Sequence, residues 1–303
     1  MEAVILTIIT AATPLLLAAM GELVVERSGV LNLGVEGMMV VGAVCGFGAA
    51  YATGYVAIGI LAGIAGGMVM ALLFAVMTQT LLSNQVATGL ALTLLGLGVS
   101  GLIGESFVGV PGVKLGQIYI PFLTDLPFVG RIVFGQDILV YTSIILVFAT
   151  SHVLFKTRTG LIIRAIGGNH HSAHALGYNV VAVRYKTILF GGACSGLAGA
   201  YLSLAYTPQW VENMTAGRGW IALALVVFAS WLPVRIMIGA YLFGTIWIMG
   251  LVVQAMGLGI PSQLLSSLPY LVTIIALVII SGNRNLTKIN SPAMIGQPFV
   301  PDR

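Results

Sequence analysis

The sequence contains very little charge. Only 7% of its 303 residues are Asp, Glu, Lys or Arg, whereas a soluble domain carries roughly 25%. Between Gly37 and Gly104 there is no Asp, Glu, Lys, Arg or His. A soluble domain is excluded, because a water-facing surface needs polar side chains, whereas a helix in lipid satisfies its own backbone groups. Together with a mean hydropathy of +1.05, the scarcity of charge predicts an all-α polytopic membrane protein.

The sequence also lacks the motifs of common catalytic and nucleotide-binding sites. No GxxxxGK[ST] P-loop occurs, so the chain is predicted not to hydrolyse ATP itself. No HExxH or GxSxG segment is present. The two cysteines, Cys45 and Cys194, lie inside apolar segments, so no disulfide framework is implied. We therefore expect a protein that is not an enzyme and that holds no cofactor.

A metal site and a nucleic-acid partner are both disfavoured. His170, His171 and His174 lie close together, and the first and last share one helix face. No Asp, Glu or Cys is close in sequence to complete a metal site, so a solvated helix face is the favoured interpretation. The sequence pI of about 9.2 is attributed to Lys and Arg on the cytoplasmic side of the membrane.

Apolar runs near the 20 residues that a helix needs to cross a membrane recur along the chain. They predict about nine transmembrane helices, within a range of about eight to ten. The first run has no basic segment before it, so it is expected to be a retained helix and not a cleaved signal peptide. The nine runs are 3–21, 38–54, 56–82, 86–107, 138–155, 184–206, 218–233, 236–257 and 267–281.

The basic residues predict the orientation of the chain. Lys156–Lys186 holds five of the 13 Lys and Arg and no Asp or Glu, so it is predicted to be cytoplasmic. With nine spans, ten basic residues lie inside and three outside, which puts the N-terminus outside and the C-terminus inside. Residues 1–303 then form one transmembrane domain. It has a cytoplasmic segment at 156–183, an extracytoplasmic loop at 109–136 and an irregular cytoplasmic tail at 282–303.

A polar segment, Gly21–Met38, separates the first two apolar runs. Charges at membrane depth are costly, so they usually pair or line a cavity. We expect Glu26 and Arg27 to pair with other charges at the inner surface. Asn32 and Glu36 either cap a short turn, which is the favoured interpretation, or face a pathway beside a broken helix.

A second polar segment, Trp210–Trp220, precedes the seventh apolar run. Its Glu212 and Arg218 are expected to pair locally, to contact an external partner or to face a pathway. The two tryptophans are typical of anchors at the membrane interface.

Small residues form two rows at helical spacing. Such rows let helix backbones approach closely in lipid, so they predict a tightly packed bundle and not a pore. The rows are Gly59, Gly63 and Gly67 in one run, and Gly192, Gly196 and Ala200 in another.

Three segments resemble the permease subunits of ABC importers in the branched-chain amino acid, ribose and nucleoside group. ERSGVLNLGVEGMM (Glu26–Met39) is similar to a signature of that group, and RAIGGNHHSAHALGYNV (Arg164–Val180) resembles its cytoplasmic coupling segment. GRGWIALALVVFASW (Gly217–Trp231) looks like a third shared block. The run TPLLLAAMGELVVERSGVLNLGVEGMM is similar to the branch that imports nucleosides with a basic-membrane-protein type lipoprotein.

The resemblance implies a helical bundle like that of type II ABC importers, in the bacterial cytoplasmic membrane. Two permease subunits, often two related chains, would enclose one pathway for a small neutral polar solute. Two ATPase subunits would bind ATP and Mg below, and an extracytoplasmic substrate-binding lipoprotein would deliver the solute above. The missing P-loop agrees with ATP hydrolysis in a partner subunit.

The resemblance also implies a short coupling helix within Gly167–Gly177, seated in a groove of the ATPase. Arg164 would anchor the helix, and small residues would allow close approach. The family usually shows an acidic residue and Pro after Gly-x in this segment, where this chain has Gly168, Asn169, His170 and His171. The predicted coupling residues are Arg164, Ala165, Gly167, Gly168, Asn169, Ala173, Ala175 and Gly177.

For the solute we expect a nucleoside, because the apolar runs offer aromatic and uncharged polar side chains for stacking and hydrogen bonding. A ribose-type sugar is the main alternative and a branched-chain amino acid is less favoured. A secondary transporter is disfavoured, since most runs lack an intramembrane carboxylate. The predicted pathway residues are Asn32, Glu36, Phe47, Phe74, Asn84, Gln85 and Thr88, and Glu212 and Arg218 are the candidate contacts with an external partner.

Overall fold

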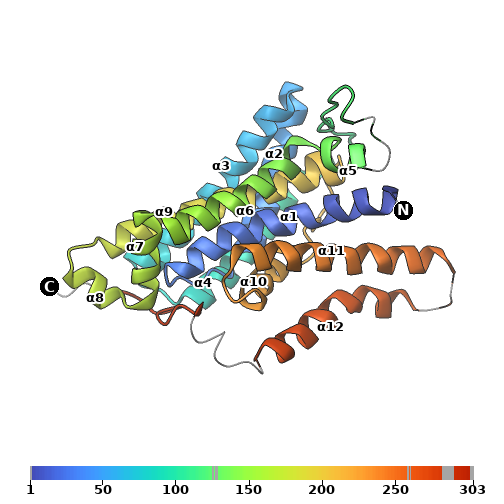
Figure 1. Cartoon of the computed structure of the whole chain (residues 1–303). Helices are drawn as coiled ribbons and strands as arrows, with labels where there is room; N and C mark the ends of the chain where they lie inside the picture. The colour runs from blue at the N-terminus through green and yellow to red at the C-terminus, as the bar shows by residue number, and fades with distance from the viewer. Residues whose placement is uncertain are drawn as a thin grey trace.

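The computed structural model describes residues 2–124, 126, 129–257, 259, 261–281 and 290–300, which form an all-helical bundle without a β-strand (Figure 1). This confirms the predicted fold class. The helices are α1 (Glu2–Arg27), α2 (Val35–Thr53), α3 (Val56–Ala75), α4 (Gln85–Gly104), α5 (Val129–Phe134), α6 (Ile138–Lys156), α7 (Arg158–Gly168), α8 (His170–Ala175), α9 (Val180–Tyr201), α10 (Arg218–Phe228), α11 (Pro233–Ala255) and α12 (Ser262–Ser281).

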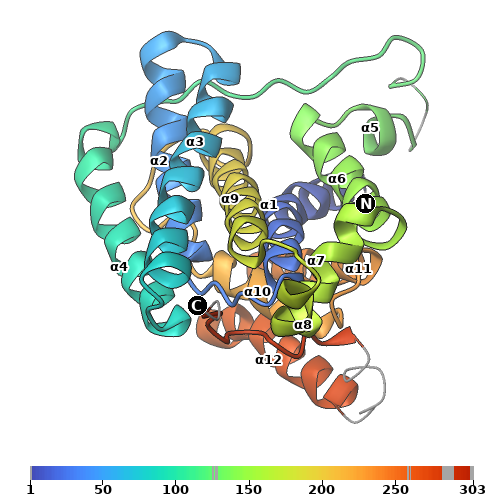
Figure 2. The same cartoon turned by 90° about the vertical axis from the view of Figure 1, so that its left-hand side faces the viewer.

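The axes of the long helices are roughly aligned, with some helices running in opposite senses, and α1 lies inside the bundle (Figures 1 and 2). In Figure 2, α2, α3 and α4 lie to one side of α1 and α9, while α6 and α7 lie to the other. The coupling segment (α7 and α8) and the C-terminal residues meet at one end of the bundle. The N-terminus and α5 lie at the opposite end (Figure 1).

Seven helices of the described chain are long and apolar enough to cross a membrane. The predicted count of nine is not confirmed. The seventh predicted run, 218–233, contains α10, whose 11 residues are too few to cross the hydrocarbon core, which needs about 20. The ninth run corresponds to α12, which has 20 residues and contains Pro269 but is not among the seven.

The polar segment after the first run is shorter than predicted. The first helix was expected over 3–21, but α1 continues to Arg27, and its last two turns, with Glu22 and Glu26, are buried inside the protein. Only residues 28–34 link α1 to α2. Gly29, at φ 86°, ends α1 in the left-handed conformation that glycine adopts without strain.

The two rows of small residues pack against each other, in agreement with the tightly packed bundle that their spacing predicted. A Cβ added to Gly196 of α9 would lie 2.2 Å from the Gly63 carbonyl oxygen of α3. On the same helix, a Cβ added to Gly199 would lie 1.9 Å from the Met39 carbonyl oxygen of α2. Helices α2, α3 and α9 therefore approach backbone to backbone, which allows dispersion contacts that larger side chains would prevent.

Segment 109–136 contains one short helix, α5, and no helix in its described part is long enough to span. Asp125 lies outside the described residues, as do Arg284, Lys288 and Arg303 of the predicted tail. Residues 290–300 of that tail are irregular and pack against the coupling segment.

Substituting Gly196 with Ala should destabilise the bundle, because the added methyl group overlaps α3. We expect the free energy of unfolding to fall by about 1–3 kcal/mol, the usual cost of overpacking. Gly98→Ala on α4 is the matched control, since a Cβ there meets nothing within 4 Å. Thermal unfolding of the purified protein measures both, and equal stability of the two variants would contradict the packing.

Candidate functional site

A short helix, α10, lies between two strained turns. Asn213 and Ala216 before it have φ values of 54° and 47°, and Ser230 and Trp231 after it have 51° and 55°. Positive φ is uncommon for residues other than glycine and costs about 1–3 kcal/mol at each position unless the surroundings hold it. The contacts at each end of α10 show what holds these turns.

The Glu36 carboxylate holds the N-terminal end of α10. Its Oε1 accepts hydrogen bonds from the Gly217 N–H at 2.7 Å and from the Thr215 hydroxyl at 2.5 Å, and its Oε2 accepts from the Gly219 N–H at 2.6 Å. The first N–H groups of a helix have no partner within the helix, and a carboxylate there is also stabilised by the helix dipole. Glu36 is only 2% exposed, so these bonds are shielded from water.

The last residues of α1 hold the other end of α10. The Trp231 indole N–H donates to Glu26 Oε2 at 2.5 Å, and Arg27 Nη2 donates to the Trp231 carbonyl at 2.8 Å. Arg27 Nη1 donates to the Asn290 carbonyl at 2.8 Å. The expectation that Glu26 and Arg27 pair with other charges is therefore wrong within the described chain. Because α1 extends to Arg27, both side chains point into the protein and meet an indole and carbonyl groups.

A cavity of about 690 Å³ opens beside the N-terminal end of α10, lined by residues of α2, α4, α10 and α12. Glu36 and Asn213 contribute polar groups, and Trp220 and Tyr270 contribute aromatic rings. Short helices whose N-termini point at a cavity are a recurrent way to bind polar solutes within a membrane. This cavity is the candidate pathway site.

The structure brings one of the seven predicted pathway residues, Glu36, to this cavity. Asn32 is buried and its N–H donates to Glu22 Oε1 at 3.3 Å. The other five lie elsewhere: Phe47 and Phe74 in separate apolar clusters, Asn84 at the N-cap of α4, Gln85 accepting the Leu31 N–H, and Thr88 hydrogen-bonded to Ser83.

Sequence reasoning missed Asn213, Trp220 and Tyr270 as lining residues. Trp220 was considered only as an interfacial anchor, and it is 47% exposed. No sequence signal marks Tyr270, because only the packing of α12 beside α10 brings its ring to the cavity.

The predicted coupling helix is α8, which is shorter than the range Gly167–Gly177. The Asn169 side chain caps it by accepting the Ser172 N–H at 3.0 Å. Arg164 stacks on Phe155, with its guanidinium carbon 5.1 Å from the ring centroid. Of the other predicted coupling residues, Gly167 and Ala173 are buried, and Ala165, Gly168, Asn169, Ala175 and Gly177 are exposed.

Arg184, fully buried at the start of α9, joins α8 to the bundle. Its Nη2 donates to His170 Nδ1 of α8 at 3.2 Å, and its Nε donates to the Ser28 carbonyl at 3.3 Å. Its Nη1 lies 3.1 Å from the Gln297 carbonyl and 3.5 Å from Gln79 Oε1. Burial, then the charge of Arg184, lowers the pKa of His170 to about 4. The imidazole is therefore neutral at pH 7 and accepts the Arg184 N–H.

The C-terminal strap, residues 290–300, closes over the coupling segment. The Phe299 ring lies 5.2 Å from the His170 ring and 5.3 Å from the His174 ring, centroid to centroid. The Met294 N–H donates to the Gly167 carbonyl at 2.9 Å. A Cβ on Gly167 would lie 2.1 Å from the Arg27 carbonyl oxygen, so only glycine lets α7 approach the end of α1 this closely.

The two candidates for external contact differ. Glu212 is exposed. Arg218 is held within the chain, because its guanidinium donates to the Met214 carbonyl at 3.0 Å and lies 5.3 Å from the Trp247 ring centroid. The two side chains do not form an ion pair with each other in the structure.

Comparison with known proteins identifies the family. Residues 4–281 match the model described as "Branched-chain amino acid transport system / permease component". A putative glucose ABC transporter permease protein of Haloferax volcanii is 42% identical over 89% of this chain and 88% of its own. A guanosine ABC transporter permease protein of Bacillus subtilis is 32% identical over 98% of this chain and 97% of its own.

A nucleoside ABC transporter permease protein of Lactococcus lactis is 31% identical over 93% of each chain. No solved structure matches the chain. These findings confirm the family resemblance that the three segments indicated.

Replacing Glu36 with Ala should release α10, because the Gly217 and Gly219 N–H groups and the Thr215 hydroxyl lose their acceptor. An unsatisfied buried donor costs about 1–3 kcal/mol, so we expect the free energy of unfolding to fall by roughly 2 kcal/mol or more. Glu105→Ala, at an exposed carboxylate, is the control. Thermal unfolding and solute uptake are the measurements, and a stable, active Glu36→Ala protein would show that this carboxylate does not hold α10.

Proposed function

The chain belongs to the family of permease components of the branched-chain amino acid transport system, and we propose that it forms half of the pathway of an ATP-driven importer for nucleosides. It is a permease subunit of an ABC transporter. The observation that carries the proposal is the cavity at the N-terminal end of α10, lined by two aromatic rings and two polar side chains.

The lining of this cavity suits a neutral solute that contains rings. Trp220 and Tyr270 offer flat apolar surfaces, and ring stacking contributes about 0.5–1.5 kcal/mol beyond area burial. Asn213 can both donate and accept hydrogen bonds. Both Glu36 carboxylate oxygens already accept bonds from the α10 end, so Glu36 shapes the site more than it attracts a cation. A nucleoside, with a planar base and hydroxyl groups, meets these features.

Energy would arrive through contact with separate ATPase subunits, since the sequence has no P-loop. We propose that the exposed face of α8, with Ala175 and Leu176, docks on the ATPase. A push on α8 would reach Arg184 through His170, and then the α1–α2 link through the Ser28 carbonyl. The end of α1 holds Trp231 behind α10. This series of contacts connects the docking face to the cavity and gives alternating access a mechanical route.

The same proposal places the chain in the cytoplasmic membrane with its C-terminus and α8 on the cytoplasmic side. A second permease, related but distinct, would complete the pathway. An extracytoplasmic lipoprotein would dock at the other end, where Glu212 is exposed.

A sugar is the second candidate solute. The relative named as a putative glucose permease shares 42% identity with this chain, against 32% for the guanosine permease. Aromatic rings also stack on sugar rings, which supports a sugar as the second candidate but supplies no partner for the hydrogen-bonding edge of a base.

Uptake of labelled uridine, adenosine, ribose and glucose in cells with and without the gene tests the solute. In cells without the gene we expect loss of nucleoside uptake alone. In cells with the gene, Trp220→Ala should lower nucleoside uptake about tenfold through lost stacking, whereas Trp220→Phe should retain most of the uptake. Loss of sugar uptake alone would overturn the nucleoside proposal and leave the permease role standing.

Substituting Ala175 with Glu should uncouple ATP hydrolysis from uptake, because a bulky charge would disrupt the exposed docking face of α8. Ala173 is unsuitable for this test, since it is 3% exposed and packs against Phe299. Gly116→Glu, at an exposed position with no neighbour within 4 Å of an added Cβ, is the control. Uptake and ATPase activity of the assembled importer are measured, and normal uptake by Ala175→Glu would refute docking through this face.

A further inference from the structure

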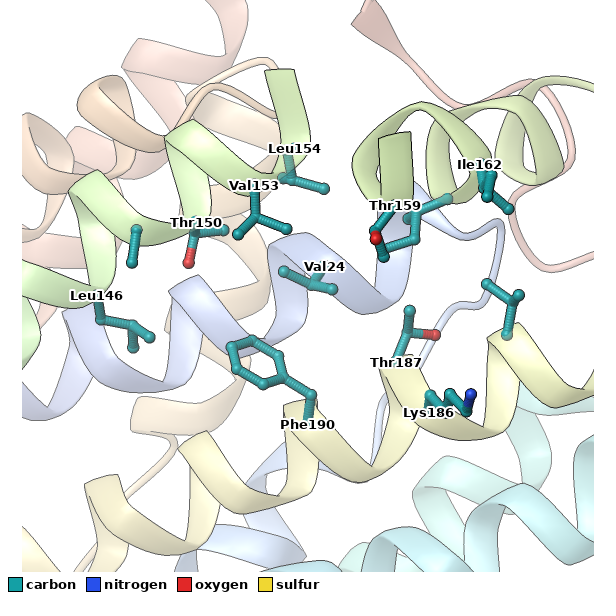
Figure 3. Close-up of a pocket in the computed structure, with 13 residues that line it drawn as sticks. Val24, Leu146, Thr150, Val153, Leu154, Thr159, Ile162, Lys186, Thr187 and Phe190 are labelled. Atoms are coloured by element: carbon teal, nitrogen blue, oxygen red, sulfur yellow. The ribbon is translucent and has the colours of Figure 1, made fainter. Parts of the chain in front are cut away.

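A second cavity lies away from the candidate pathway, where α6, α7 and α9 meet over α1 (Figure 3). Its volume is about 450 Å³, within the range of sites for small ligands. In Figure 3, α1 lies behind the cavity, α6 and α7 lie above it and α9 lies below it. Neither the transport mechanism nor the three resembling segments account for it.

The cavity walls are mostly apolar, three threonines interrupt them, and their one charged side chain lies at one end. Leu146, Val153 and Phe190 face it from α6 and α9. At the end near α7, Thr159 and Lys186 contribute a hydroxyl and an ammonium group. This is the pattern that an acyl chain with a polar head requires.

The charge around the polar end is of one sign. Lys186 is exposed at the rim, and Lys156 and Arg158 lie within three residues of Thr159. From Ile138 to Val211 the sequence contains no Asp or Glu. The two carboxylates of α1 near this end, Glu22 and Glu26, face Asn32 and Trp231 instead. Basic pockets between helices at a membrane surface favour anionic lipid head groups.

We propose that this cavity binds an anionic phospholipid, with one acyl chain between α6 and α9 and the phosphate on Lys186. The inference goes beyond the transport function and does not depend on which solute is carried. The lipid would contact Thr187, whose hydroxyl donates to Ser28 Oγ at 2.9 Å. Its chain would also pack on Ile162 and Ile163 of α7. It would thereby hold the coupling segment against the bundle.

The test uses the complete importer, purified with its partner subunits and incubated with vesicles of phosphatidylcholine mixed with phosphatidylglycerol. Lipid retained after repurification is identified by mass spectrometry. We expect wild type to retain phosphatidylglycerol. Lys186→Gln should bind it about fivefold more weakly, because each basic residue near an anionic membrane surface contributes about 1 kcal/mol. Lys186→Glu removes one charge and adds the opposite one, so it should bind about 30-fold more weakly. Lys186→Arg should bind as wild type does. Lys114→Glu, in the segment 109–136, is the matched charge control.

Ala149→Trp provides an independent variant, because its ring would fill the apolar part of the cavity. It should lose phosphatidylglycerol although Lys186 is intact. Equal retention of both lipids by wild type, or undiminished phosphatidylglycerol on Lys186→Glu, would overturn the proposal. A further variant, Ala149→Cys, tests whether the second permease covers the cavity. If a membrane-soluble thiol reagent fails to react with this cysteine in lipid-free detergent, the second permease covers the cavity and the proposal is wrong.

Discussion

The structure depends on how the backbone N–H groups of α10, a helix too short to cross the lipid, are satisfied. Helix α10 is about 16 Å long at 1.5 Å per residue, so its first N–H groups lie inside the protein where water cannot satisfy them. The Glu36 carboxylate accepts two of these N–H groups and the Thr215 hydroxyl. Glu36 therefore holds the N-terminal end of α10, which forms one wall of the cavity.

This constraint explains why two distant segments are needed together. Segment Glu26–Met39 supplies Glu36 to one end of α10 and Glu26 and Arg27 to the turn that follows it. Segment Gly217–Trp231 contains α10 and the turn after it. The positive φ values at Ser230 and Trp231 persist because α1 binds both the indole N–H and the carbonyl of Trp231. The charged residues of the first segment thus fix the geometry of the second.

The sequence predicted the helices well and the site only in part. The absence of charge and the spacing of apolar runs predicted a membrane bundle and located the seven long apolar helices, but they also predicted a span at 218–233, where α10 has only 11 residues. The small-residue rows predicted close packing without showing which helices meet. Arg184 could not be assigned, because its partners Ser28 and Gln297 are more than 100 residues away and no local pattern links them. The cavity was missed for the same reason: Trp220 and Tyr270 meet only after α10 and α12 pack. Where polar residues interrupt an apolar run, composition does not distinguish a surface turn from a buried network.

The placement of Arg184 indicates how a membrane bundle can transmit force. A buried guanidinium cannot easily lose its partners, since each bond to a charged donor is worth about 1.5–3 kcal/mol and water is not present to replace it. Arg184 contacts α8, the α1–α2 link and the C-terminal strap at once. Moving α8 alone would break these bonds, so the less costly motion carries the link and the strap with it. The link leads directly into α2, whose second residue, Glu36, holds α10. If α8 docks on the ATPase as we propose, a displacement there would reach the cavity through the bonds of Arg184 and then through the α1–α2 link.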